Sequence, residues 1–207
     1  MWSAELISNR DQMLSRVEYL KKLPLHDPGT YLHLGCGPQI IPLFDNVDKY
    51  YQHPQVQNYD MYLLPHESGS VKAIYSSHSL EHLPFRHARL ALKEWARVLS
   101  DNGCLYLAVP DMELCFQAMM NPSVSFYNKW HWFVYTIWGF QVDPNSGQNP
   151  DLNLPVDPGQ FHQCGFSKEF LQVELESVGL QIRNIFSYDG WDTPSIFVEA
   201  IKGATLV

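Results

Sequence analysis

Cysteine is scarce in this 207-residue chain, and no two cysteines form a C-x-x-C pair. A disulfide framework or a four-cysteine zinc site needs paired or closely spaced cysteines, so both classes are disfavoured. We expect reduced thiols, as is typical of a cytoplasmic protein. The scattered cysteines are Cys36, Cys104, Cys115 and Cys164.

Long apolar runs and runs of positive charge are also missing. No stretch approaches the roughly 18 apolar residues of a membrane span, and residues 1–25 do not read as a signal peptide. The formal net charge is −8, without a Lys/Arg run, so a nucleic-acid partner is not expected. Hydrophobic residues make up 45% of the chain, enough for a sizeable core. We predict a single domain over residues 1–207.

Strand and helix patterns alternate along the chain. This alternation predicts an α/β fold with a doubly wound, seven-stranded, mostly parallel sheet. The turn-rich residues 188–192 leave no room for a crossover helix, so the last two strands should form an antiparallel hairpin. The expected helices cover residues 1–22, 86–100 and 167–177, and the expected strands lie at 31–34, 46–48, 56–60, 71–76, 104–109, 180–186 and 195–201.

Residues 111–165 do not follow this alternation. The segment is too long for an ordinary connection, so we predict a functional insert or lid over the substrate side of the sheet. Within it, the aromatic run 130–138 has the length of a helix and suits packing or the wall of a pocket.

The most informative motif is the glycine turn, Gly35-Cys36-Gly37, which directly follows the apolar strand 31–34. Glycines at such a turn let the backbone approach a nucleotide-type cofactor closely. A dinucleotide fingerprint would place a third glycine at position 40, where this chain has Ile40. Its acidic residue lies about 20 residues beyond the glycines, whereas Asp48 is only eleven residues past Gly37. A cofactor with a ribose but no pyrophosphate therefore fits better than NAD.

Five segments in order resemble the motifs of class I S-adenosylmethionine-dependent methyltransferases. They are 32–38 with the glycine turn, 46–48 with Asp48, 59–61, 73–83 with the sequence Leu80-Glu81-His82-Leu83, and 98–105. The stretch from His162 to Gly179 is similar to the closing helix of a small bacterial-type subgroup. In the fifth segment Asp101-Asn102 replaces the usual Pro-Gly, which departs from the family pattern.

The resemblance implies S-adenosylmethionine as cofactor and assigns roles to eight residues. The glycine turn would contact the amino-acid tail of S-adenosylmethionine, and Asp48 would accept hydrogen bonds from its ribose hydroxyls. Asp60 or Met61 would meet the adenine, while Ser77 and His78 would line the reacting side. The implied cofactor-binding residues are Gly35, Cys36, Gly37, Asp48, Asp60, Met61, Ser77 and His78.

The sequence His78-x-x-Glu81-His82 also matches the H-x-x-E-H pattern of one class of zinc peptidases. That pattern lies within a longer helix, whereas Pro84 ends this element at once. Three ligand-type residues on one turn could also bind a divalent metal, and a metal-dependent branch of methyltransferases has a similar Glu/His cluster there. We nevertheless expect no metal here, and a His82 that is hydrogen-bonded near the cofactor cleft.

Two residues are candidates for catalysis. Asp111 follows the strand 104–109 and either faces the substrate or caps a helix that starts near Met112. His162 offers a group that titrates near neutral pH, and it acts either as a base or as an anchor for its loop.

The sequence thus predicts methyl transfer to a small-molecule acceptor. One alternative is a non-catalytic methyltransferase-like binding protein, and a second is an NAD-dependent oxidoreductase. A homodimer is compatible with the sequence, and no membrane partner is expected.

Overall fold

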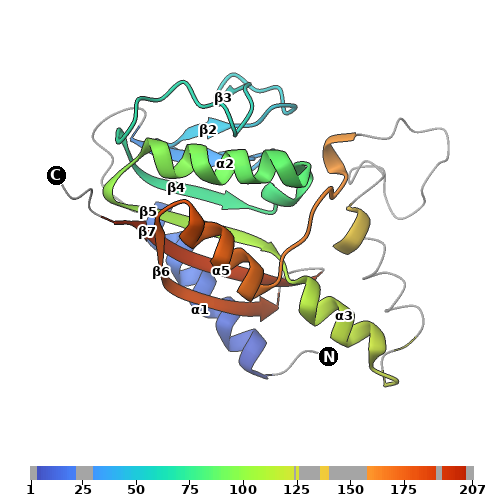
Figure 1. Ribbon diagram of the computed structural model, residues 1–207. Coiled ribbons are helices and arrows are strands. Elements are labelled where there is room, and N and C mark those ends of the chain that lie inside the picture. The colour runs from blue at the N-terminus through green and yellow to red at the C-terminus, as the bar shows by residue number, and fades with distance from the viewer. Residues whose placement is uncertain are drawn as a thin grey trace, which may run out of the picture.

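A computed structural model of the protein describes residues 4–21, 30–123, 125, 136–139, 158–189 and 193–203. Its centre is a seven-stranded sheet with the strand order β3-β2-β1-β4-β5-β7-β6 (Figure 1). The strands are β1 Tyr31–Leu34, β2 Asp45–Val47, β3 Val56–Gln57, β4 Val71–Ser77, β5 Leu99–Pro110, β6 Leu180–Asp189 and β7 Pro194–Lys202. The helices are α1 Ala4–Lys21, η1 Leu80–His82, α2 Phe85–Val98, α3 Met112–Met120, η4 Pro158–Gln160 and α5 Lys168–Ser177.

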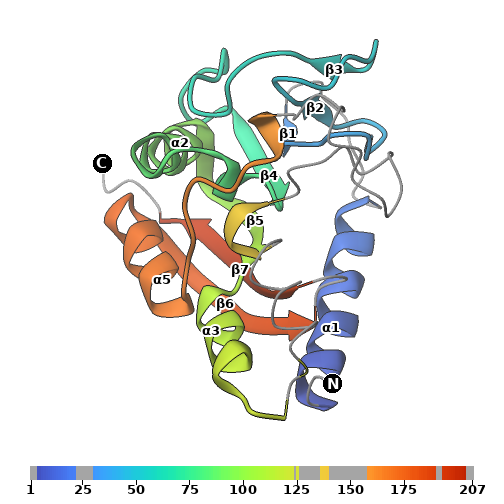
Figure 2. The ribbon, with the colours of Figure 1, turned by 90° about the vertical axis from the view of Figure 1, so that its right-hand side faces the viewer.

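Five strands of the sheet run parallel, from β3 through β5 in the spatial order. β7 pairs antiparallel with both β5 and β6. The predicted fold class, a mostly parallel seven-stranded sheet with an antiparallel C-terminal hairpin, is confirmed. Because the carboxyl ends of β1, β2, β4 and β5 meet at one edge, the turns that follow them lie together there, and Figure 2 looks onto this edge.

Two apolar layers enclose the sheet. α2 and α5 cover one face, where fully buried Leu107 and Trp95 belong to an aliphatic-rich core. α1 lies on the opposite face (Figure 2), where Met13 and Val17 belong to a second core that is rich in aromatic side chains. α1 is held against β6 by Asn9, whose side-chain amide donates to the carbonyl of Ser187 at 2.8 Å. The sheet is therefore covered on both faces, as near-continuous apolar strands such as β5 require.

The first half of the sheet has turns where a doubly wound fold usually has crossover helices. Residues 35–44, 48–55 and 58–70 connect β1 to β4 without forming a helix. The buried side chain of Asn46 supports the first connection: its Nδ2 donates to the carbonyls of Ile41 and Phe44, both at 3.0 Å. Its Oδ1 accepts from the Ile41 amide at 3.0 Å. One buried amide thus satisfies the polar groups that a helix would otherwise pair internally.

The sequence misplaced several boundaries. β6 extends to Asp189, beyond the expected end at residue 186 and into the expected turn 188–192. The sequence also extended the helix of residues 86–100 to Ser100, but α2 ends at Val98 and β5 begins at Leu99. Asn102 has φ 60°, and the register against β4 shifts between Val71 and Ala73. The predicted break at residues 101–103 is thus an irregularity within a strand, because the flanking residues still pair with β4. β3 is also shorter than expected, with only Val56 and Gln57.

The predicted start and end of the closing helix are confirmed. The Ser167 hydroxyl accepts from the Phe170 amide at 3.2 Å, as an N-cap residue should. Gly179 lies just beyond the helix with φ 86°, a left-handed conformation that favours glycine.

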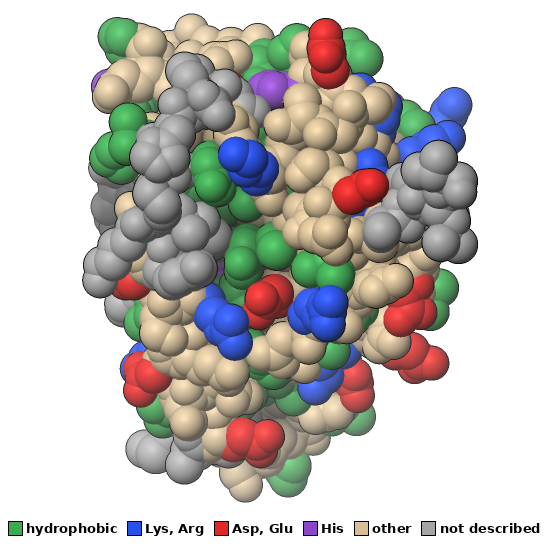
Figure 3. Space-filling view, turned by 90° about the vertical axis from the view of Figure 1, so that its left-hand side faces the viewer, with side chains coloured by type: hydrophobic (Ala, Val, Ile, Leu, Met, Phe, Trp, Pro, Cys, Tyr) green, Lys and Arg blue, Asp and Glu red, His purple; other side chains and the backbone are tan. Residues whose placement is uncertain are grey.

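All four cysteines are free, as the sequence analysis expected. Within the described parts of the chain, no helix combines the length and the apolar character needed to cross a membrane. The side of the molecule opposite the edge of Figure 2 carries charged side chains of both signs among hydrophobic ones (Figure 3).

The N-cap of α5 can be tested by substitution of Ser167. Ser167→Ala removes the acceptor for the Phe170 amide and should lower the free energy of unfolding by about 1 kcal/mol. Ser167→Asp keeps an acceptor at this position and should stay close to the parent protein. Urea unfolding measures the free energy of unfolding of both variants. An equal loss of stability in the two variants would contradict a capping role for Ser167.

Candidate functional site

The glycine turn lies at the carboxyl end of β1, and both of its glycines have left-handed backbones. Gly35 has φ 68° and Gly37 has φ 47°. The amides of Gly35 and Cys36 both donate to the carbonyl of Val47, at 2.8 and 3.0 Å. These two amides therefore fasten the turn to β2, so the expected contact of backbone amides with an amino-acid carboxylate does not extend to them.

The two glycines are needed for different reasons. A Cβ on Gly35 would overlap the side chain of Ser79, which follows β4. The methyl end of Met61 approaches the same position. A Cβ on Gly37 would meet no atom within 4 Å. Gly35 thus allows the turns after β1 and β4 to touch, whereas the space beside Gly37 is open to a ligand.

Asp48 directly follows β2 and lies beside the glycine turn. Its Oδ2 accepts from the Gly37 amide at 2.9 Å, and its Oδ1 accepts from the amides of Tyr50 and Tyr51, both at 2.9 Å. A carboxylate offers about four acceptor positions, and these bonds use three of them. The side chain is half-buried, so Asp48 keeps room for one further donor.

Asp60 and Met61 lie in the connection that follows β3. The Asp60 carboxylate pairs with Lys49, with 2.8 Å between Oδ1 and Nζ. The Met61 carbonyl accepts from the indole nitrogen of Trp95 at 2.8 Å, so the Met61 backbone is anchored to α2. Asp60 is therefore the more accessible of the two polar groups, with 27% of its side chain exposed.

Ser77 ends β4, and His78 follows it in a strained conformation, with φ 51°. The His78 amide donates to the carbonyl of Ala108 at 2.9 Å, which ties this turn to β5. The ring nitrogen Nε2 lies 3.3 Å from the Ser195 hydroxyl of β7. Strained backbone at a non-glycine residue is typical of functional sites.

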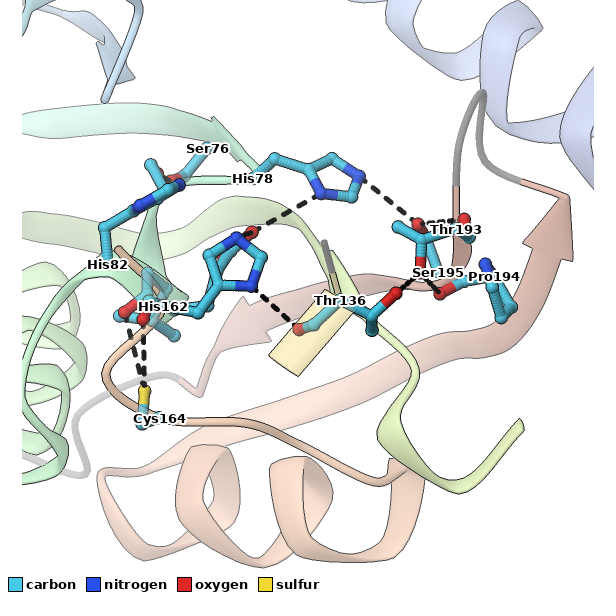
Figure 4. A network of polar contacts seen from close by, with 12 residues as sticks. Ser76, His78, His82, Thr136, His162, Cys164, Thr193, Pro194 and Ser195 are labelled. Atoms are coloured by element: carbon cyan, nitrogen blue, oxygen red, sulfur yellow. Dashed lines mark hydrogen bonds and ion pairs between the residues drawn. The ribbon is translucent and has the colours of Figure 1, made fainter. Parts of the chain in front are cut away.

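Four ionisable side chains form a cluster next to this turn, which we call the Glu/His cluster: His78, Glu81, His82 and His162. Glu81 is 0% exposed. His78 Nδ1 lies 3.4 Å from Glu81 Oε1, and His162 Nε2 lies 3.9 Å from the same oxygen. The rings of His82 and His162 meet edge to face with centroids 4.8 Å apart. Figure 4 shows the three histidines together, with Thr136 and Ser195 beside them.

The charges in the cluster influence one another. Burial opposes ionisation of Glu81, but the facing histidines together hold the pKa of this carboxyl below its usual range. Burial lowers the pKa of His162, and the nearby Glu81 only partly offsets this effect. The histidines therefore favour the ionised form of the Glu81 carboxyl, and burial favours the neutral form of His162.

His162 reaches the cluster because its segment docks on η1. The amides of Gln163 and Cys164 both donate to the carbonyl of Glu81, at 2.7 and 3.2 Å. The Gln163 side chain adds a bond of 2.8 Å to the carbonyl of His82. Residues 161–164 thus lie at the carboxyl edge, next to η1. Most of that insert, including residues 130–135 of the aromatic run, lies outside the described residues.

Asp111 has the capping role that the sequence analysis left open. Its Oδ1 accepts from the Leu114 amide of α3 at 3.1 Å, and its Oδ2 accepts from the Ser187 hydroxyl at 2.6 Å. The residue is 0% exposed. A fully buried carboxylate with both oxygens engaged has no surface for an acceptor, so the expectation of a catalytic Asp111 is corrected.

Several contributors to this edge escaped the sequence analysis. Ser79 carries no motif signal of its own, yet it contacts Gly35 and its hydroxyl donates to the carbonyl of Leu34 at 3.3 Å. The roles of Lys49 and Ser195 likewise depend on partners elsewhere in the chain. Lys49 pairs with Asp60, and Ser195 lies beside the ring of His78. Glu81 was considered only as part of sequence motifs, among them H-x-x-E-H, although a glutamate between Leu80 and Leu83 is costly to bury without a partner.

Comparison with known proteins agrees with this geometry. Residues 32–107 match a family model described as a methyltransferase domain. A search of curated proteins found no significant match. The matched residues run from β1 into β5 and include the glycine turn, Asp48 and Glu81.

Solved structures share the fold at low sequence identity. A SAM-dependent methyltransferase from Methanosarcina mazei is 15% identical, with a TM-score of 0.59, and the match covers 84% of this chain and 92% of that one. Magnesium protoporphyrin IX methyltransferase from Synechocystis PCC 6803, with bound SAH, is 15% identical, with a TM-score of 0.57 and coverage of 94% and 84%. The [4+2]-cyclase SpnF is 14% identical, with a TM-score of 0.56 and coverage of 94% and 82%.

These findings confirm the predicted resemblance to class I S-adenosylmethionine-dependent methyltransferases and agree with the predicted cofactor. They do not bear on individual site residues. SpnF shows that one fold carries more than one chemistry, so the activity must be argued from the site.

The two glycines of the turn give a matched pair of substitutions. Gly37→Ala should cost about 1–2 kcal/mol of unfolding free energy, because only its left-handed backbone is strained. Gly35→Ala carries the same strain and adds an overlap with Ser79, for which overpacking typically costs a further 1–3 kcal/mol or so. Urea unfolding of both variants tests this order, and equal losses would contradict the contact between the two turns.

Proposed function

We propose that this protein is a methyltransferase that transfers the methyl group of S-adenosylmethionine to a small-molecule acceptor. The observation that carries the proposal is the meeting of the glycine turn, Asp48 and the turn after β4 at one edge of the sheet. Ligands of open α/β sheets bind at the carboxyl ends of the strands.

The described residues suit this cofactor. The open space beside Gly37 permits close approach of a ligand to the backbone. Asp48 would take a ribose hydroxyl at its remaining acceptor position, and Asp60, paired with Lys49, would meet the adenine edge. The side chain of Met61 would contact the cofactor beside Gly35. Cys36, Ser77 and His78 would line the rest of the cofactor site. Burial raises the pKa of the Cys36 thiol to about 12, so this side chain stays neutral against a ligand.

Bound S-adenosylmethionine supplies an electrophilic methyl group. The protein contributes mainly by holding the acceptor in line with that group and by excluding water, both of which lower the entropic barrier. His162 Nε2 lies at this edge, and burial lowers the pKa of this side chain, which favours its neutral form. It can therefore accept a proton from an acidic acceptor or coordinate a cation.

A small acceptor is favoured over a nucleic acid. The formal net charge of −8 opposes a polyanion. A non-catalytic binding protein with this fold stays the second candidate. It is favoured by Asp101-Asn102 in place of the Pro-Gly of related enzymes and by the absence of helices from residues 35–70.

Asp48 tests the cofactor assignment. Asp48→Asn removes a charged acceptor, and hydrogen bonds to charged groups contribute about 1.5–3 kcal/mol. Binding of S-adenosylhomocysteine should therefore weaken by about 10–100-fold, measured by isothermal titration calorimetry. Asp101→Asn, at the opposite edge of the sheet, is the matched control and should bind as the parent does.

Loss of folding must be separated from loss of binding. The urea midpoint of Asp48→Asn shows whether the turn over residues 48–51 persists, and Asp60→Asn gives a second variant that does not hold that turn. If both variants bind S-adenosylhomocysteine as tightly as the parent protein, the assignment of these carboxylates is wrong.

A further inference from the structure

Glu81 poses a problem that the proposed function does not solve. Its side chain is completely buried, and neither carboxylate oxygen has a hydrogen-bond partner among the described residues. His78 Nδ1, at 3.4 Å, is within ion-pair range of Oε1 but not in hydrogen-bond geometry. A buried carboxylate without donors is strongly unfavourable. Such an orphaned group in a folded protein calls for a water molecule or an ion beside it.

The nearest imidazoles are oriented to coordinate a cation. His82 Nδ1 lies 3.2 Å from the carbonyl of Phe161, and His162 Nδ1 lies 2.9 Å from the carbonyl of Thr136. A carbonyl only accepts hydrogen bonds, so both Nδ1 atoms carry the hydrogen. In the neutral rings both Nε2 atoms then hold a free lone pair. Metal-bound histidines are typically oriented in this way, by a hydrogen bond from the other ring nitrogen to a backbone carbonyl.

The distances between these side chains also suit binding to one shared metal ion. The ligand atoms of Glu81, His82 and His162 all lie within 4.8 Å of one another. Nitrogen and oxygen atoms about 2.1 Å from a tetrahedral ion stand about 3.4 Å apart. His162 Nε2 and Glu81 Oε1, at 3.9 Å, would close by roughly half an ångström. The widest separation, up to 4.8 Å, would close by about 1.4 Å, which side-chain rotations provide.

We propose that Glu81, His82 and His162 bind one divalent transition-metal ion at the carboxyl edge of the sheet. Two imidazoles and one carboxylate favour zinc and its neighbours over magnesium or calcium, which prefer oxygen ligands. The same set of ligand types, with an open position, occurs in catalytic zinc sites. The positive charge of the ion compensates the negative charge of the buried Glu81 carboxylate.

The site has a consequence for the acceptor. η1, which carries Glu81 and His82, directly follows Ser79, the residue that contacts Gly35, so the ion would lie beside the cofactor turn. A metal ion lowers the pKa of a bound hydroxyl group. The acceptor class would then be a molecule with a hydroxyl group. This last step rests on the proposed function, whereas metal binding itself does not.

Metal binding is tested on the purified, chelator-treated protein with zinc chloride alone. Equilibrium dialysis should give one tightly bound zinc per chain, and zinc should raise the urea midpoint because it binds the folded state. His82→Ala and His162→Ala should each weaken zinc binding by more than about 100-fold, since even outer partners of metal ligands account for about 10–100-fold. Magnesium chloride should produce neither effect.

Two further variants guard against misinterpretation. His87→Ala removes a histidine that stacks on Tyr62 outside the cluster, and it should bind zinc as the parent does. Glu81→Gln keeps the shape of the side chain and removes its charge, so it should fold and yet lose zinc. If the parent protein binds no stoichiometric zinc, or if Glu81→Gln and His162→Ala bind it as the parent does, the proposal is wrong.

Titration with S-adenosylhomocysteine separates this proposal from the proposed function. If metal-free protein binds S-adenosylhomocysteine but no zinc, the metal site alone is refuted. If it binds zinc but no S-adenosylhomocysteine, the metal site stands and methyl transfer is refuted.

Discussion

The buried residue Glu81 is the constraint on which the candidate site depends. Its backbone carbonyl accepts two amides from residues 163 and 164, which joins the end of the long insert to the turn after β4. Its side chain is fully buried and faces three histidines. A carboxylate in such a place must be compensated by positive charge, because burial removes its hydration. The same residue therefore organises the backbone of the site and sets the charge that a ligand must supply.

The other half of the site is built from turns rather than helices. Asn46 supports the connection between β1 and β2 from inside, and the contact of Gly35 with Ser79 joins two turns that follow neighbouring strands. The amides of Gly35 and Cys36 are used by the fold itself. In the proposed function, recognition of a cofactor at this turn would rely on Asp48, on Asp60 and on the open space beside Gly37.

Most of the fold was predictable, because it follows from local patterns. Apolar runs placed the parallel strands, and Ser167 and Gly179 marked the ends of the closing helix. Errors arose where pairing between strands overrides local preference. Residues 99–103 read as a helix end and a turn, yet they belong to β5, because Leu99 and Cys104 on either side of the irregularity pair with Val71 and Ala73 of β4. The two roles of Asp111 were equally compatible with the sequence. Only the Leu114 amide and the Ser187 hydroxyl decide between them.

By itself, the sequence determined the class of fold, the position of the glycine turn and the type of cofactor, since these depend on short motifs and on the order of strands. The tertiary structure decided which polar groups are still available and which residues meet. His162 lies far along the chain from Glu81, and no local pattern links them. They meet because the carboxyl ends of parallel strands share one edge and because the returning segment completes its backbone hydrogen bonds on the carbonyl of Glu81.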